Sequence, residues 1–143
     1  MSIAKLFGVA LVFVASLTVA AQCSSAERHL HVRQQDGERL QNLVNAGHEP
    51  WRLDAEAVAS EYFLTLEKTP KDAWDVYGQH PSTMSDGREK AEYRFVSAIH
   101  PNKTYYITVR RFDYLLPLAR RWDWVVWIVT DAKVVSCHSE PAD

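Results

Sequence analysis

The sequence predicts a single α+β domain in which N-terminal helices pack on one face of an antiparallel sheet of three or four strands. Apolar residues recur at helical spacing in the first half of the chain. From Ala91 onward they alternate with polar residues, which is typical of strands. About 120 residues follow the leader described next, a common size for one domain, and no linker-like stretch divides them.

Residues 1–21 are typical of a secretory signal. Lys5 gives a positive end, an apolar run begins at Leu6, and small residues close the segment at Ala20 and Ala21. The run is short for a membrane span and contains glycine and hydroxyl residues, although an uncleaved anchor is the alternative. We expect export, to the medium or to the outer face of the cell membrane.

The two cysteines have three alternative fates. Cys23 and Cys137 can form a disulfide in an oxidising compartment. Cys23-Ser24-Ser25 after an apolar run also resembles the acylated start of a bacterial lipoprotein, although Gln22 stands where that pattern has Gly, Ala or Ser. This resemblance implies a lipid anchor at a membrane surface. Acylation excludes the disulfide, and two free thiols are the third alternative.

Residues 22–37 are expected to form a polar leader, and the folded domain is expected over residues 38–143. Asp36-Gly37 should interrupt any helix within the leader. A short helix is then predicted over 38–46, with Gly47 as its C-terminal stop.

A second helix is better specified. Asp54 is a good N-cap, and Thr69-Pro70 should end the helix because a residue before proline avoids the helical region. Trp51, just before the cap, is expected to pack against Val58. One apolar stripe runs along the helix: Ala55, Val58, Ala59, Tyr62, Phe63 and Leu66.

Residues 70–90 have no clear period and contain several Pro and Gly residues. Trp74, Val76 and Tyr77 are too apolar for a free loop, so we expect them to pack on the core. Three strands follow, over 91–99, 104–112 and 123–130, and residues 132–137 are a candidate fourth. A tight turn is predicted at 100–103 and a longer connection at 113–122.

Alternation assigns the two faces of the predicted sheet. The core face is nearly all apolar and carries Tyr93, Phe95, Ile99, Tyr105, Ile107, Val109, Val125, Trp127 and Val129. The other face carries Arg94, Val96, Tyr106, Thr108, Arg110, Phe112, Trp124, Val126 and Ile128.

The second face is the candidate binding surface, because Trp, Tyr and Arg dominate binding hot spots. Its candidate residues are Arg94, Tyr106, Arg110 and Trp124, and a protein, peptide or glycan is the expected ligand. The alternative is that residues 70–90 fold over this face and bury it, since large exposed apolar patches are uncommon on monomers.

Composition and motifs argue against several functions. The chain has 16 Lys and Arg against 18 Asp and Glu, a net charge of −2, which does not favour a nucleic-acid partner. The six histidines are scattered without metal-ligand spacing, and no nucleophile elbow or phosphate loop occurs. We therefore expect no metal, no cofactor and a non-catalytic role, with membrane contact only through the signal or a lipid anchor. The competing hypotheses are a hydrolase using acids in residues 70–90, such as Asp86 with His80, and a protease-inhibitor-like module.

Trp51-Arg52-Leu53-Asp54, followed by Val58-Ala59 and later by Trp127-Ile128-Val129, resembles a group of small exported bacterial proteins of no assigned activity. The order of helix before strand meander is also similar to exported inhibitor-like modules of the protease-propeptide kind. The first resemblance implies an exported α+β domain and no particular site residues.

Overall fold

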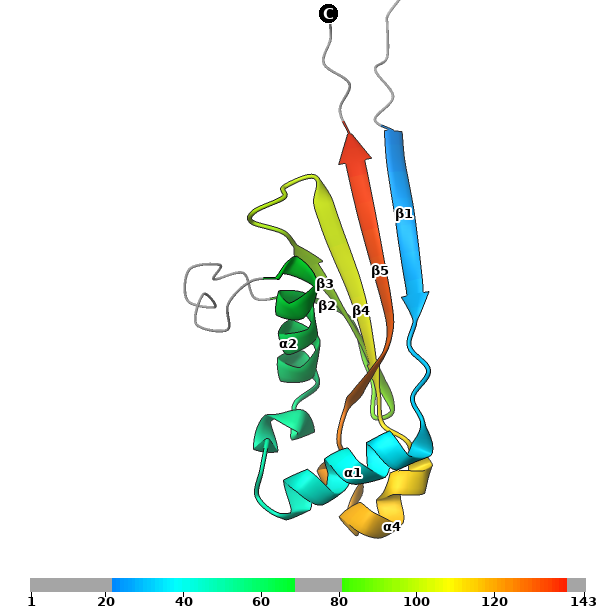
Figure 1. The fold of residues 1–143 in the computed structure, drawn as a ribbon. Coiled ribbons are helices and arrows are strands. Elements are labelled where there is room, and N and C mark those ends of the chain that lie inside the picture. The colour runs from blue at the N-terminus through cyan, green and yellow to red at the C-terminus, as the bar shows by residue number, and fades with distance from the viewer. Residues whose placement is uncertain (1–21, 69–80, 139–143) are drawn as a thin grey trace, which may run out of the picture.

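Five antiparallel strands form one sheet, in the order β1-β5-β4-β3-β2 (Figure 1). The computed structural model describes residues 22–68 and 81–138. The α+β prediction is confirmed, with five strands where three or four were predicted. The elements in chain order are β1 (Gln22–His29), α1 (Gln34–Asn45), the 3₁₀ turn η1 (Pro50–Leu53), α2 (Ala55–Glu67), β2 (Ser82–Asp86), β3 (Lys90–Val96), β4 (Lys103–Arg110), η3 (Asp113–Leu115), α4 (Leu116–Ala119), η4 (Trp122–Trp124) and β5 (Ile128–His138).

The segment expected to be a polar leader, 22–37, is instead a strand and the start of a helix. β1 lies along the outer edge of β5 in antiparallel register, from Gln22 opposite His138 to His29 opposite Asp131. Every residue of β1 is exposed. A strand that buries neither face has no apolar alternation, so only its pairing with a distant strand defines it.

Helix α1 passes through Asp36-Gly37, so the predicted interruption there is wrong. Gly37 is buried against Tyr114, and a Cβ at this position would lie 2.5 Å from the Tyr114 hydroxyl oxygen. The residue is therefore a point of close approach within a helix. The predicted stop is confirmed, because Gly47 has φ +83° and its N–H donates to the carbonyl of Val44.

Helix α2 matches its prediction. The Asp54 carboxylate accepts a hydrogen bond from the N–H of Ala57 at 3.1 Å, which caps the first turn. The helix ends at Glu67, where Lys68 takes a left-handed conformation, while Thr69-Pro70 lies outside the described residues. Figure 1 shows α2 lying against one face of the sheet.

The first hydrophobic core lies between α2 and this face. Phe63 stacks on Phe95 at 4.7 Å between ring centroids and meets Tyr105 edge-on at 5.3 Å. Trp51 and Trp127 pack at the same cluster, as the predicted contact of Trp51 requires. The predicted core residues Tyr93, Ile107 and Val109 are also buried there.

Hydrogen bonds connect the C-terminal end of α2 to the sheet. The Glu67 carboxylate accepts hydrogen bonds from the Tyr105 hydroxyl and from Ser97 Oγ, the latter at 2.6 Å. Burial and the neighbouring carboxylate both raise the pKa of Tyr105, so this hydroxyl stays protonated and donates.

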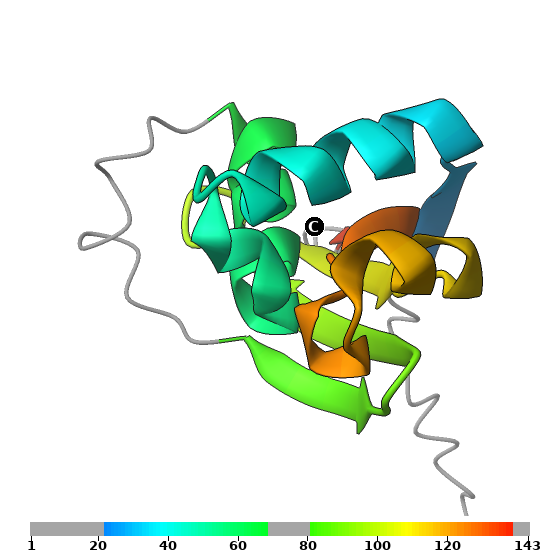
Figure 2. The same ribbon diagram turned by 90° about the horizontal axis from the view of Figure 1, so that it is seen from below.

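A second core lies at the other end of the molecule, where α1 and α4 meet (Figure 2). Gln41 is fully buried there and holds the irregular segment 124–126. Its amide nitrogen donates to the Trp124 carbonyl at 2.9 Å, and its amide oxygen accepts from the Val126 N–H at 3.0 Å. The buried members of this core are Val44, Leu115, Ala119, Val125, Val126 and Ile128.

The second core explains why the predicted strand 123–130 is wrong at its start. Residues 122–124 form a 3₁₀ turn, and β5 begins only at Ile128. The predicted strands 123–130 and 132–137 are one strand, bent at a bulge where the register with β4 shifts between Thr108 and Val109. The predicted connection 113–122 contains η3 and α4.

Two further predictions fail in part. Ile99, assigned to the core face, is 46% exposed because β3 ends at Val96 and residues 97–102 form a turn. The turn at 100–103 is confirmed by a hydrogen bond from the Lys103 N–H to the His100 carbonyl at 2.8 Å. Within residues 70–90, β2 pairs at the edge of β3 and does not lie over the sheet; Trp74, Val76 and Tyr77 lie outside the described residues.

Candidate functional site

The face of the sheet opposite α2 carries mostly polar side chains, and we call it the open face. By strand alternation it contains Lys90, Glu92 and Arg94 on β3, Tyr106, Thr108 and Arg110 on β4, Asp131, Lys133 and Val135 on β5, and Glu27 and His29 on β1.

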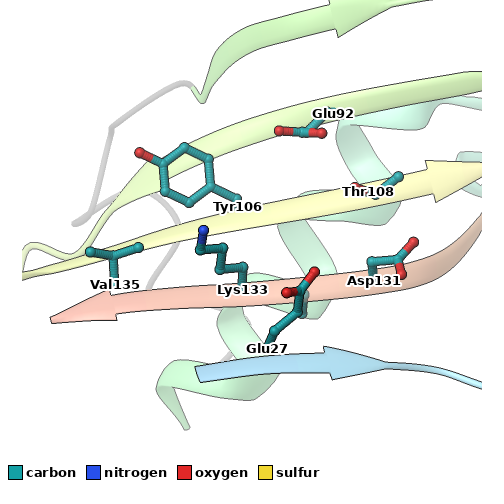
Figure 3. A pocket seen from close by; sticks show the side chains of 8 residues that line it. Glu27, Glu92, Tyr106, Thr108, Asp131, Lys133 and Val135 are labelled. Atoms are coloured by element: carbon teal, nitrogen blue, oxygen red, sulfur yellow. The ribbon is translucent and has the colours of Figure 1, made fainter. Parts of the chain in front are cut away.

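A shallow hollow of about 300 Å³ lies in the middle of the open face (Figure 3). Strands β1, β3, β4 and β5 all contribute to its lining. The lining residues are Glu27, Glu92, Tyr106, Thr108, Asp131, Ala132, Lys133 and Val135. Three of these are carboxylates and one is an ammonium, so the hollow has an acidic excess.

Three side chains form an acidic row across the hollow. Glu92 is in register with Thr108, and Thr108 is in register with Asp131. Figure 3 shows the three projecting from neighbouring strands. Thr108 lines the hollow and is only 7% exposed as a residue. Its hydroxyl is not among the buried polar atoms that lack a partner in the described residues, which belong to Ser60, Arg111 and Tyr114.

A basic row lies two residues further along the strands. Arg94 is in register with Tyr106, and Tyr106 with Lys133. Two residues of strand correspond to about 7 Å, which is the spacing between the rows. Among the described residues, neither Arg94 nor Lys133 forms a side-chain hydrogen bond or ion pair, and the same holds for Glu92.

The β1 end of the acidic row is an ion pair. The Asp131 carboxylate accepts a hydrogen bond from Thr130 Oγ1 at 2.7 Å and lies 2.6 Å from His29 Nδ1. These two contacts hold the pKa of Asp131 below its usual range. The hydrogen bond to Asp131 and the charge of Glu27 together raise the pKa of His29. Asp131 is therefore ionised throughout the neutral range.

The same edge carries a disulfide between Cys23 and Cys137. The two residues face each other directly in the β1–β5 register, with their Cα atoms 4.0 Å apart. Of the three alternatives for the cysteines, the structure contains the disulfide, and a molecule that has this bond cannot carry an acyl group on the Cys23 thiol. The link joins residues 114 positions apart and fixes the edge strand beside the hollow.

The structure places the predicted binding residues in two different regions. Arg94 and Tyr106 lie together in the basic row. Arg110 lies on the same face of β4 as Tyr106, exposed at the far end of the strand opposite Lys90, and its charge helps to lower the pKa of Asp131. Trp124, 46% exposed, lies in η4 near Leu118 and is not on the sheet. Phe112, Val126 and Ile128, also predicted on this face, pack in the second core.

Sequence reasoning missed Glu27, Glu92, Asp131 and Lys133. Glu27 falls in the segment predicted to be a polar leader, and the bulge near Thr130 reverses the alternation that would identify the β5 residues. Alternation within 90–96 puts Glu92 on the same face as Arg94, and this is the signal that identifies it.

The residues named for the catalytic alternative lie only in part within the described ranges. Asp86 is exposed at the end of β2, and His80 lies outside the described ranges. Within residues 22–68 and 81–138, no group of three His, Cys, Asp or Glu side chains is arranged to hold a metal ion. In the same ranges, no helix combines the length and apolarity needed to cross a membrane.

Comparisons of the chain with protein-family models, with curated proteins and with solved structures give no match.

Proposed function

We propose that this protein is an exported, non-catalytic binding domain whose ligand occupies the hollow of the open face. The observation that carries the proposal is the hollow itself, where side chains of opposite charge from four strands, among them Glu92 and Lys133, line one concave surface. Glu92, Arg94 and Lys133 form no ion pair with another described residue. Groups that the fold leaves unsatisfied are the ones that a polar ligand satisfies.

Export is supported by two features. The leader has the organisation of a secretory signal, and a structural disulfide is typical of proteins that fold in oxidising compartments. The mass of the mature protein isolated from its host tests this part. Loss of about 21 residues, together with the mass deficit of one disulfide, supports it. An intact Met1 form, or an acyl adduct on Cys23, contradicts it.

The binding role is tested by amide NMR spectra of the labelled full chain, titrated with the small-molecule fraction of an envelope extract. We expect shifts confined to Glu92, Tyr106, Thr108 and Lys133 and their neighbours. The molecules that cause the shifts should be recovered chemically unchanged. Shifts centred on Trp124, or conversion of the bound molecule to a product, would contradict the proposed function.

A further inference from the structure

We infer that the ligand of the hollow is a small zwitterion of the amino-acid class, bound with its ammonium on the acidic row and its carboxylate on the basic row. This inference rests on the proposed function and specifies its ligand. It follows from the order of charges along the strands and from the spacing of the two rows.

The acidic row suits an ammonium group. A primary ammonium donates three hydrogen bonds, and the row presents three acceptors from adjacent strands: the carboxylates of Glu92 and Asp131, with the Thr108 hydroxyl oxygen between them. Asp131 keeps its charge because Thr130 and His29 stabilise the carboxylate. Charge-assisted hydrogen bonds of this kind are the stronger ones in proteins.

The basic row suits a carboxylate. The Lys133 ammonium and the Tyr106 hydroxyl are both donors, and Figure 3 shows them on adjacent strands at one side of the hollow. Arg94 stands opposite Tyr106 and adds a second cation beside the hollow. Glu27 of β1 is in register with Lys133 and also lines the hollow, and its carboxylate lies 3.9 Å from His29 Nε2. A purely cationic ligand would leave the donors of the basic row unused and would be repelled by them.

The spacing favours a short zwitterion over a long one. The rows are about 7 Å apart along the strands. In an α-amino acid one carbon separates the ammonium nitrogen from the carboxylate, and a hydrogen bond of about 2.8 Å at each end makes up the difference. The hollow of about 300 Å³ is at the small end of the range for ligand sites, which agrees with a ligand of this size.

The test is an amide NMR titration of the labelled full chain with three probes: glycine, ethylamine and acetate. We expect glycine to saturate shifts at Thr108 and Tyr106 with an affinity at least about tenfold above that of ethylamine or acetate, because only glycine uses both rows. Equal affinity for glycine and ethylamine would overturn the inference in favour of a simple cation site. Acetate binding as well as glycine, or no shift with any probe, would also overturn it.

Substitutions test whether each row contributes to glycine binding. Glu92→Gln and Lys133→Met should each weaken glycine binding about tenfold, whereas the matched controls Glu89→Gln and Lys90→Met, outside the hollow, should not. Thr108→Val keeps the side-chain shape and removes the hydroxyl, so it should weaken binding without lowering the melting temperature. Thr104→Val, on the same strand, is its control. Loss of glycine binding in the control variants, or its retention in the hollow variants, contradicts the inference.

The outcomes separate the two proposals. If the extract shifts the open face but glycine does not, the zwitterion inference fails and the binding role stands. If neither the extract nor any of the three probes shifts these amides, both fail.

Discussion

On the face of the sheet that α2 covers, the Phe63 ring stacks on Phe95 and contacts Tyr105 edge-on. The Tyr105 hydroxyl donates a hydrogen bond to the Glu67 carboxylate. On the opposite face, Glu92 and Lys133 stand without ion pairs among the described residues. The first face is covered by packed side chains. In the described part of the chain, the second face is linked at its β1 edge by the disulfide and the His29–Asp131 contact. Side chains that folding does not use are free to serve a ligand.

The largest effect should come from the edge link. Replacing both Cys23 and Cys137 by Ser should lower the free energy of unfolding by about 4 to 5 kcal/mol, because the bond closes a loop of more than 100 residues in the unfolded chain. Chemical denaturation measures the loss, and reduced wild-type protein should reproduce it. Hydrogen exchange at β1 amides should rise as well. A loss below about 1 kcal/mol would show that strand pairing alone holds the edge.

The covered face should respond to loss of one ring. Phe63→Ala removes the side chain that contacts both Phe95 and Tyr105, so we expect a loss of about 3 to 5 kcal/mol in unfolding free energy. Trp124→Ala is the control, because that large side chain is 46% exposed and should cost much less. Equal losses for the two variants would mean that the ring contacts do not stabilise this face.

The second core depends on one polar side chain. Gln41→Leu keeps the volume but leaves the Trp124 carbonyl and the Val126 N–H without partners, so we expect a loss of about 2 to 3 kcal/mol in denaturant unfolding. Gln34→Leu, exposed in the first turn of the same helix, should have almost no effect. If the Gln41 variant were as stable as the wild type, the segment 124–126 would be held by packing alone.

The smallest effect is electrostatic and lies at the β1 edge. The pKa of His29 is raised above 6.5, so its pairing with Asp131 is complete below that pH and is lost as pH rises through the folded-state pKa. The pKa of Asp131 is lowered below 3.8, so its contribution is present above that pH and is lost as pH falls through the folded-state value. The pair is therefore strongest between these two pKa values.

An NMR titration of the His29 ring measures this pairing directly. In the wild type the ring should titrate above its ordinary pKa, and Asp131→Asn should move that pKa back toward 6.5. An unchanged His29 pKa in the Asp131 variant would contradict the proposed ion pair.

The same contrast between faces explains what could be predicted from the sequence. Helix α2 and strands β3 and β4 bury one side, so their periodicity is visible and places Tyr93, Ile107 and Val109 correctly. Strand β1 buries neither side, and nothing local distinguishes it from a loop. Its partner is more than 100 residues away, where only the matching cysteine gives a signal.

The structure of the second core could not be predicted from the hydrophobic pattern, for the opposite reason. Val125, Val126, Trp127 and Ile128 are all buried, in two different cores, so every position of this run is apolar. A continuous apolar run fits a strand as well as an irregular buried segment. The deciding contact is the side chain of Gln41, 83 residues before the Trp124 carbonyl that it binds. For this reason the sequence predicts Trp124 on the open face, whereas the structure places it beside Leu118.

Thermal unfolding of the Glu92→Gln, Lys133→Met double variant, with and without glycine, tests most directly whether the open-face charges serve a ligand. Without glycine, the variant should unfold within about 0.5 kcal/mol of the wild type, because these groups have no partners to lose. Added glycine should raise the melting temperature of the wild type and leave that of the variant unchanged. A variant that is less stable by more than about 1 kcal/mol without glycine, or equal stabilisation of both proteins, would contradict the account.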